Sequence, residues 1–102
     1  MEVLTLDYLD KPITNSVVVL REEFDDWAIL FNPDTAAASG INPVGVAVWK
    51  RMDGKKSIKE IVSEINACFE EVPNDAAEEI ALFVNSLAEK GFVGYAITDT
   101  HR

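Results

Sequence analysis

The sequence predicts a single α+β domain in which a three-stranded antiparallel sheet is followed by a three-helix bundle. Three observations support this. Residues 17–41 contain β-rich runs separated by turn signals, residues 43–90 contain segments with helical apolar spacing, and those segments begin at capping residues. A chain of 102 residues has room for one hydrophobic core, and its 48% apolar content is enough to build it.

The first 41 residues are expected to supply an arm and the sheet. Residues 1–16 contain no long apolar period and are interpreted as an N-terminal arm. From Val17, the β-rich runs VVVLREEF and WAILF stand on either side of Asp25-Asp26, which predicts a hairpin. Apolar side chains alternate onto both faces of residues 27–31, so we expect this run to be the central strand.

A third strand is expected at Thr35–Ile41. It follows Asn32-Pro33-Asp34, a turn signal in which proline fixes φ and Asx side chains bond to nearby backbone groups. The side chains of this strand are almost all small, so little bulk shields its backbone. As the last strand of the sheet, it is the natural edge to which an extended peptide could add.

Capping residues mark the start of the first two helices. Asn42 as N-cap, followed by Pro43, predicts the start of the first helix, and Gly54 its end. Ser57 and Glu60 have the spacing of a capping box at the start of the second. Apolar stripes predict the buried faces, with Val44, Val48, Trp49 and Met52 in the first helix and Ile58, Ile61, Val62, Ile65, Cys68 and Phe69 in the second.

The third helix is expected to begin near Asn74 or Asp75 and to end at Lys90-Gly91. Residues 92–97 can add a short extended piece before the polar tail at 98–102. Three helices covered by a small antiparallel sheet make an α+β domain of the winged-helix kind. The expected core stripe of the third helix is Ala76, Ile80, Phe83, Val84 and Leu87.

The charge balance opposes nucleic-acid binding. The chain has 9 Lys and Arg against 18 Asp and Glu, a net charge of −9. A winged-helix DNA-binding regulator is kept as the alternative function, although the acidic third helix would repel phosphates. Five of the nine basic residues fall within ten positions, which we interpret as solvated charge around a helix end: Lys50, Arg51, Lys55, Lys56 and Lys59.

Residues that could carry catalysis or hold a cofactor are scarce. Cys68 is the single cysteine and is expected to be a small buried hydrophobe, while His101, the single histidine, lies next to the C-terminus. Trp27 and Trp49 are expected to be core aromatics. We therefore expect no enzyme activity, no metal and no organic cofactor.

The sequence also predicts a cytoplasmic protein without membrane contact. No stretch approaches the roughly 18 apolar residues needed to span a bilayer. The N-terminal residues are acidic where a secretory signal peptide would be basic.

An ordered set of residues resembles the PqqD family. The family has a Leu-Asn, Gly, Ile-Trp, Asp-Gly pattern and ends in a Leu-x-x-x-Gly segment, and the resemblance covers about residues 17–95. Ile41 stands where leucine is usual. The matching residues are Ile41-Asn42, Gly45, Val48-Trp49, Asp53-Gly54, Ser57-Ile58, Ile61-Val62, Phe83, Leu87 and Gly91-Phe92-Val93.

The resemblance implies a peptide-recognition domain, also called a RiPP recognition element. Such domains bind the leader of a ribosomally made precursor peptide and present it to a modifying enzyme, commonly a radical SAM maturase. The pathway would be pyrroloquinoline quinone synthesis or that of another modified peptide. In these families the leader pairs with the third strand and lies against the third helix.

The expected peptide-binding residues come from those two elements. On the third helix, small side chains beside Val84 could let a peptide approach closely, or they could simply pack under the sheet, and both interpretations stay open. The candidate residues are Thr35, Ala36, Ala37, Ala38, Ser39, Gly40 and Ile41 on the strand, and Ala77, Ala81, Val84 and Ala88 on the helix.

Overall fold

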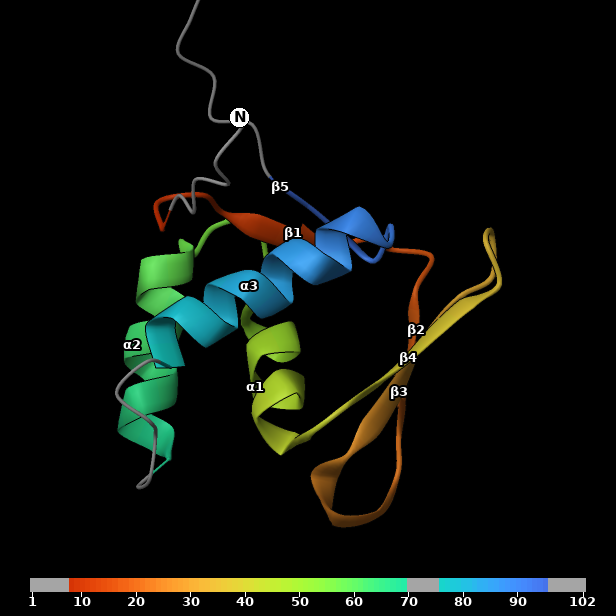
Figure 1. Cartoon of the computed structure of the whole chain (residues 1–102), viewed down its shortest axis with the longest axis horizontal. Helices are drawn as coiled ribbons and strands as arrows, with labels where there is room; N and C mark the ends of the chain where they lie inside the picture. Colours follow the sequence, from red (N-terminus) through yellow and green to blue (C-terminus); the bar gives the residue numbers. More distant parts are fainter. Residues whose placement is uncertain (1–7, 70–75, 96–102) are drawn as a thin grey trace, which may run out of the picture.

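The computed structural model describes residues 8–69 and 76–95, and it confirms the predicted α+β architecture (Figure 1). Three helices follow a three-stranded antiparallel sheet, and a second, two-stranded sheet joins the two ends of the described chain. In chain order the elements are β1 (Pro12–Thr14), β2 (Val19–Glu22), the 3-10 helix η1 (Phe24–Asp26), β3 (Ala28–Asn32), β4 (Ala37–Ile41), α1 (Pro43–Arg51), α2 (Ile58–Cys68), α3 (Ala76–Glu89) and β5 (Val93–Tyr95).

The strand order of the main sheet is β2-β3-β4, so β3 is central as predicted. Its inward side chains Ala28, Leu30 and Asn32 are buried, and the helices lie on this side of the sheet (Figure 1). On the opposite face of β3, Ile29 and Phe31 are each 41% exposed, and no helix of the described residues lies on this side. Trp27, immediately before the strand, is 51% exposed, so its prediction as a core aromatic is wrong, whereas Trp49 is buried as expected.

The turn between β3 and β4 makes the third strand shorter than predicted. Asn32 Oδ1 accepts a hydrogen bond from the Asp34 backbone N–H at 2.9 Å, and the Asn32 carbonyl accepts one from Ala36 at 2.7 Å. Ala36 has φ +62°, a left-handed conformation that stops it from continuing as strand. Thr35 and Ala36 therefore belong to the turn, and β4 begins at Ala37.

The predicted caps form at the first two helices. Asn42 Oδ1 accepts from the Gly45 backbone N–H at 2.8 Å at the start of α1. In the capping box of α2, Ser57 Oγ accepts from the Glu60 backbone N–H and Glu60 Oε1 from that of Ser57. The predicted start of the third helix, at Asn74 or Asp75, lies outside the described residues.

One residue of the α2 stripe is placed differently from the prediction. Cys68 is exposed, and its Sγ accepts a hydrogen bond from Arg51 Nη2 at 3.3 Å. It lies on the same side of the helix as Ile61, seven residues earlier, but it is the last residue of α2, and the side chains that bury Ile61 and Ile65 do not cover this end of the helix. Its expected burial is therefore wrong.

The described part of the predicted arm joins the folded body. β1 pairs antiparallel with β5, which lies within the extended piece expected at residues 92–97. Pro12 is fully buried, and the carbonyl groups of Tyr8 and Asp10 accept hydrogen bonds from the N–H groups of Lys59 and Ile58. The segment thus adds a strand and tethers the start of α2.

The cluster of basic residues forms salt bridges at the surface. Glu64 Oε1 lies 2.9 Å from Arg51 Nε and 3.2 Å from Lys56 Nζ, and Lys50 Nζ lies 2.9 Å from Glu22. The Lys56 ammonium, followed by the Arg51 guanidinium, lowers the pKa of Glu64. Hydrogen bonds from the backbone N–H groups of Lys55 and Lys56 lower the pKa of Asp53.

Asn32→Ala should destabilise the fold, because the Asn32 side chain is 2% exposed and its Nδ2 donates to the Gly91 carbonyl at 3.2 Å. The variant loses this bond and the Asx bond to Asp34. We expect a loss of roughly 1–3 kcal/mol in the free energy of unfolding, measured by urea denaturation. Asn66→Ala, at an exposed position of α2, is the control. Equal urea midpoints for both variants would contradict the structural role of Asn32.

Acid should weaken the fold through Asp53 and Glu64. A carboxylate whose pKa is lowered by folding contributes stability above its unfolded pKa, at about pH 4, and loses it as the pH falls. Asp53→Ala should therefore melt below the wild type at pH 6, and the difference in Tm should shrink towards pH 3. Glu78→Ala, at an exposed position of α3, should show no such convergence. A constant Asp53→Ala difference across this range would count against the effect.

Candidate functional site

The outer edge of β4 is open. β4 pairs with β3 on one side, and no strand of the described residues pairs with its other side. Ala38 and Gly40 are exposed on the outer face of the sheet, and Ala37 and Ser39 are half-buried on the inner face. With such small side chains the edge backbone stays accessible, so its unpaired N–H and C=O groups can accept another extended chain.

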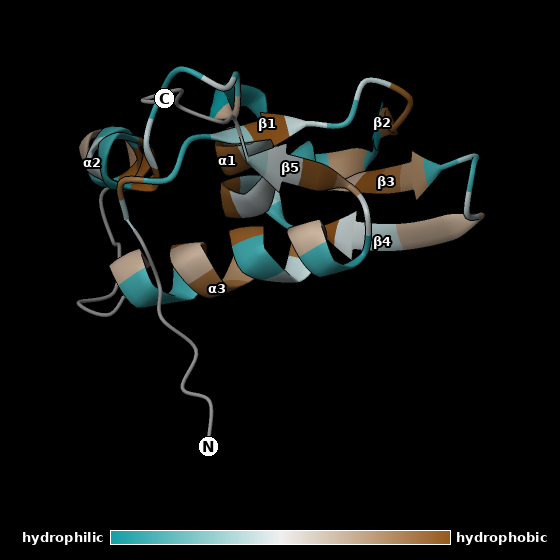
Figure 2. Ribbon diagram, turned by 90° about the horizontal axis from the view of Figure 1, so that it is seen from above, coloured by the Kyte–Doolittle hydropathy of each residue, from teal (hydrophilic) through white to brown (hydrophobic). Residues whose placement is uncertain are grey.

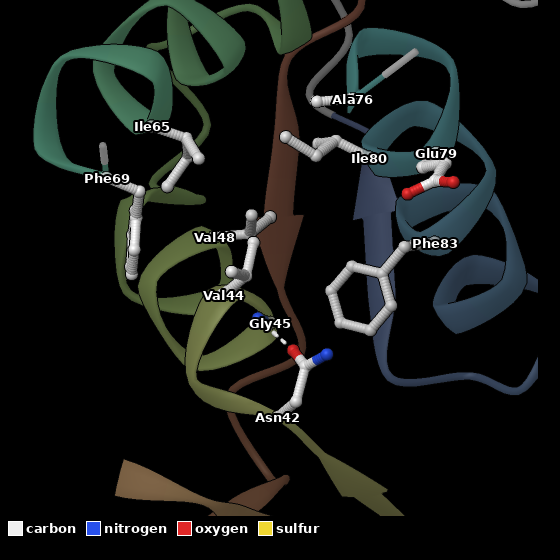
Figure 3. A pocket seen from close by; sticks show the side chains of 10 residues that line it. All are labelled: Asn42, Val44, Gly45, Val48, Ile65, Phe69, Ala76, Glu79, Ile80 and Phe83. Atoms are coloured by element: carbon white, nitrogen blue, oxygen red, sulfur yellow. Dashed lines mark hydrogen bonds between the residues drawn. The ribbon is translucent and has the colours of Figure 1, made fainter. Parts of the chain in front are cut away.

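The C-terminal end of β4 leads to an apolar pocket. Asn42 follows the strand directly, and a pocket of about 350 Å³ lies beyond it between α1, α2 and α3 (Figure 3). Val48, Ile65 and Ile80 point towards one another from the three helices (Figure 3). The complete lining is Asn42, Val44, Gly45, Val48, Ile65, Phe69, Ala76, Glu79, Ile80 and Phe83.

A close approach of two helices shapes this pocket. The ring of Phe83 reaches from α3 towards Asn42 and Gly45 (Figure 3). A Cβ at Gly45 would lie 3.1 Å from Phe83 Cζ and 3.1 Å from Ile41 Cβ. Glycine at this position therefore lets α3 approach the junction of β4 and α1, so the β4 edge and the pocket lie next to each other.

The chemistry of the site suits binding rather than bond making. Its lining is apolar except for Asn42, whose Oδ1 caps α1, and Glu79, whose side chain is exposed. Pockets of this kind bind apolar side chains. The Glu79 carboxylate at the pocket favours a ligand that carries a basic residue next to the apolar one. Within residues 8–69 and 76–95, no group of three His, Cys, Asp or Glu residues could hold a metal ion.

The predicted site residues separate into accessible and buried groups. Ala37, Ala38, Ser39 and Gly40 lie along the open edge, whereas Thr35 and Ala36 lie in the turn before it. Ile41 is buried and belongs to the core. Four of the seven strand residues predicted to bind a peptide therefore lie along the open edge of β4.

The small residues predicted on α3 do not form a groove together. Ala81 is 2% exposed and Val84 is fully buried, so both are core residues, while Ala77 and Ala88 are half-buried. Of the two interpretations, burial supports packing inside the fold for Ala81 and Val84. The α3 residue that reaches the end of β4 is Phe83, whose Cζ would lie 3.1 Å from a Cβ at Gly45.

The pocket was not predicted from the sequence. Its main signal was Gly45, a glycine in a predicted helix interior, which is destabilising unless another chain element must approach closely. The approaching element is α3, about forty residues later, and nothing in the sequence says which helices meet at Gly45. Phe83 was predicted to be an ordinary core residue, whereas it is half-buried at the border of the pocket.

None of the described helices is both long enough and apolar enough to cross a membrane. Figure 2 shows the hydropathy of the described elements: β3 is largely apolar, and hydrophilic and apolar segments alternate along α3.

Comparison with known proteins gives two matches. Residues 28–93 match the family model of PqqD, described as coenzyme PQQ synthesis protein D, and this span runs from the first residue of β3 to the first residue of β5. A solved structure, described as TbiB1 in complex with the TbiA(beta) leader peptide, has a TM-score of 0.67 and 24% sequence identity. The alignment covers 85% of this chain and 99% of that chain, so the two share a fold. No curated protein is similar enough in sequence to count as a match.

Ala81→Trp should destabilise the protein, because the indole has no space in the core around Ala81. We expect overpacking to lower the free energy of unfolding by roughly 1–3 kcal/mol or more, measured by chemical denaturation. Leu82→Trp is the matched control, since the neighbouring Leu82 is exposed. If Ala81→Trp were as stable as this control, Ala81 would face an open groove after all.

Proposed function

Because the chain belongs to the PqqD family, we propose that it binds the leader of a ribosomally made precursor peptide and presents it to a modifying enzyme. The observation that carries the proposal is the open edge of β4 beside an apolar pocket. The solved structure of similar fold, which contains TbiB1 and a leader peptide, supports it.

Strand addition to β4 would provide most of the affinity. An extended peptide completes the hydrogen bonds of the edge backbone, and this requires no particular peptide side chain. The small side chains of Ala38, Ser39 and Gly40 leave room for the backbone of the incoming strand. Binding through the main chain also explains why this edge can be so poor in bulky or charged residues.

The pocket would provide specificity. All strand pairings in the described part of the chain are antiparallel, and we extend this arrangement to the peptide. β4 runs towards Ile41 and the pocket, so an antiparallel peptide has its N-terminal end there. The pocket would then take an apolar side chain that lies N-terminal to the paired segment, and Glu79 would favour a basic neighbour.

The chain itself would catalyse no reaction and would act as a carrier. The apolar lining of the pocket offers no nucleophile paired with a base, which supports this view. The modifying enzyme would then supply the chemistry. Family resemblance suggests a radical SAM maturase as its class, and synthesis of pyrroloquinoline quinone or of another modified peptide as the pathway.

Binding of duplex DNA is disfavoured as the alternative function. The exposed side chains of α3 include Glu78, Glu79 and Glu89, and the chain as a whole carries a net charge of −9. A helix with this surface would meet strong repulsion in a groove lined with phosphates.

Proline at the edge tests strand addition. Neighbouring N–H groups of a strand point to opposite sides, so one of Ala38→Pro and Ser39→Pro removes a donor facing β3 and the other removes one facing the open edge. The variant that loses the N–H facing the open edge should fold, because proline is tolerated on edge strands. In calorimetric titrations with the cognate leader, it should bind at least about fivefold more weakly, equivalent to about 1 kcal/mol.

Circular dichroism identifies the variant that folds. If both variants fold and bind the leader like the wild type, strand addition at β4 does not occur. A second experiment tests the pocket. Val44→Trp places an indole in the pocket, and the control Ala67→Trp places the same side chain at an exposed position of α2 outside it. Only Val44→Trp should weaken binding, and equal affinities would show that the pocket takes no part.

A further inference from the structure

A second apolar surface lies on the side of the sheet that faces away from the helices. β2, β3 and β4 all contribute to it, because residues paired across antiparallel strands project to the same face. We call this surface the outer face, and its strand residues are Val19, Arg21, Ile29, Phe31, Ala38 and Gly40. Trp27, directly before β3, continues the alternation of side chains onto this face.

The apolar side chains of the outer face are accessible to solvent. Val19 is 54% exposed, and Ile29 and Phe31 are each 41% exposed. Trp27 extends the same row along β3. Single exposed apolar residues are ordinary, but a contiguous group on three strands is typical of a surface that a partner covers.

The tip of the hairpin lies at the end of this surface, directly before Trp27, and it also contacts α1. Phe24 is 86% exposed, and the two residues after it, Asp25 and Asp26, have φ values of +57° and +67°. Two consecutive left-handed residues are typical of tight hairpin turns, and Asp adopts this conformation more readily than most residues. The tip thus holds an aromatic side chain in solvent, three residues before Trp27 in the chain.

Charge distinguishes between possible partners. Asp25 and Asp26 form no ion pair within the described part of the chain, while the one cation on the outer face, Arg21, is paired with Glu23. A second copy would bring together two chains that each carry a net charge of −9. The border of the outer face therefore favours a different protein, with an apolar surface flanked by Lys or Arg.

The outer face is continuous with the proposed peptide edge. Ala38 and Gly40 of β4 lie at outward-facing positions of the sheet, so they belong to the outer face. The backbone of the same two residues forms part of the open edge. A protein seated on the outer face would therefore lie next to a peptide bound to β4. A carrier that presents a peptide needs this juxtaposition.

We propose that the outer face is the docking surface for the enzyme that modifies the bound precursor, which recognises it through an apolar patch with a basic rim. This inference rests on the proposed function, because it takes the partner to be the enzyme that receives the peptide. The leader would then bind at the edge of β4, and the enzyme would bind on the outer face beside it.

The test compares two kinds of binding by the full chain. The probes are the fluorescently labelled leader and the purified modifying enzyme encoded beside the precursor. Ile29→Thr/Phe31→Thr replaces apolar contact area with a residue that suits strands. It should bind the leader like the wild type, bind the enzyme at least about tenfold more weakly, and slow precursor modification to a similar extent at limiting carrier concentration.

Leu82→Thr, which changes an equally exposed apolar residue on α3, should match the wild type in all three measurements. Trp27→Ser, before the start of β3, repeats the test if the double variant folds poorly in circular dichroism. Unchanged enzyme binding by a folded outer-face variant would overturn the inference while leaving the proposed function intact. A wild-type dimer in sedimentation that the double variant abolishes would also overturn it, because a second copy would then cover the face.

Failure of the wild-type chain to bind the leader at all would instead refute the proposed function. Salt gives an independent check, since a basic rim on the enzyme should make its binding weaker as the salt concentration rises. Asp25→Asn/Asp26→Asn should reduce this salt dependence without affecting leader binding. Enzyme binding that is insensitive to both salt and these substitutions would contradict the assigned rim.

Discussion

Burial of the inner face of β3 under the helices is the constraint on which the rest of the structure depends. Leu30 is fully covered, and Asn32 links the end of the strand to Gly91 beyond α3 through a buried hydrogen bond. Three short helices can cover only one face of the sheet. The proposals rest on two features of this arrangement: the outer face is exposed because the helices cover the inner one, and the edge of β4 is open because β4 is the last strand of the described sheet.

The same packing accounts for the position of the pocket. Gly45 lets Phe83 of α3 reach the junction of β4 and α1, and residues of the N-terminal half of α3 line the pocket opposite α1 and α2. On the proposed function, an edge that would bind main chain thus lies beside a pocket that would bind side chains. Such a combination separates affinity, which the backbone supplies, from specificity, which one or two side chains supply.

β4 has small side chains for a reason that connects both proposals. Bulky residues at Ala38 or Gly40 would strengthen the strand but would obstruct a partner on the outer face as well as a peptide at the edge. A sheet with an open edge and an apolar outer face is exposed to aggregation. The net charge of −9 opposes self-association, so it allows these surfaces to stay available to other chains.

The sequence by itself determined the order of the three strands of the main sheet and the three helices, the central position of β3, the caps at Asn42 and Ser57 and the location of the edge strand. These features depend on local patterns, because turn residues, capping side chains and apolar periods act over a few positions. Tertiary structure decided which apolar residues are covered. Trp27 is exposed because the sheet has one covered face, Cys68 is exposed at the uncovered end of α2, and Ala81 is buried because it lies on the covered side of α3. The pocket and the pairing of β1 with β5 join segments that are far apart along the chain, and no local pattern specifies such contacts.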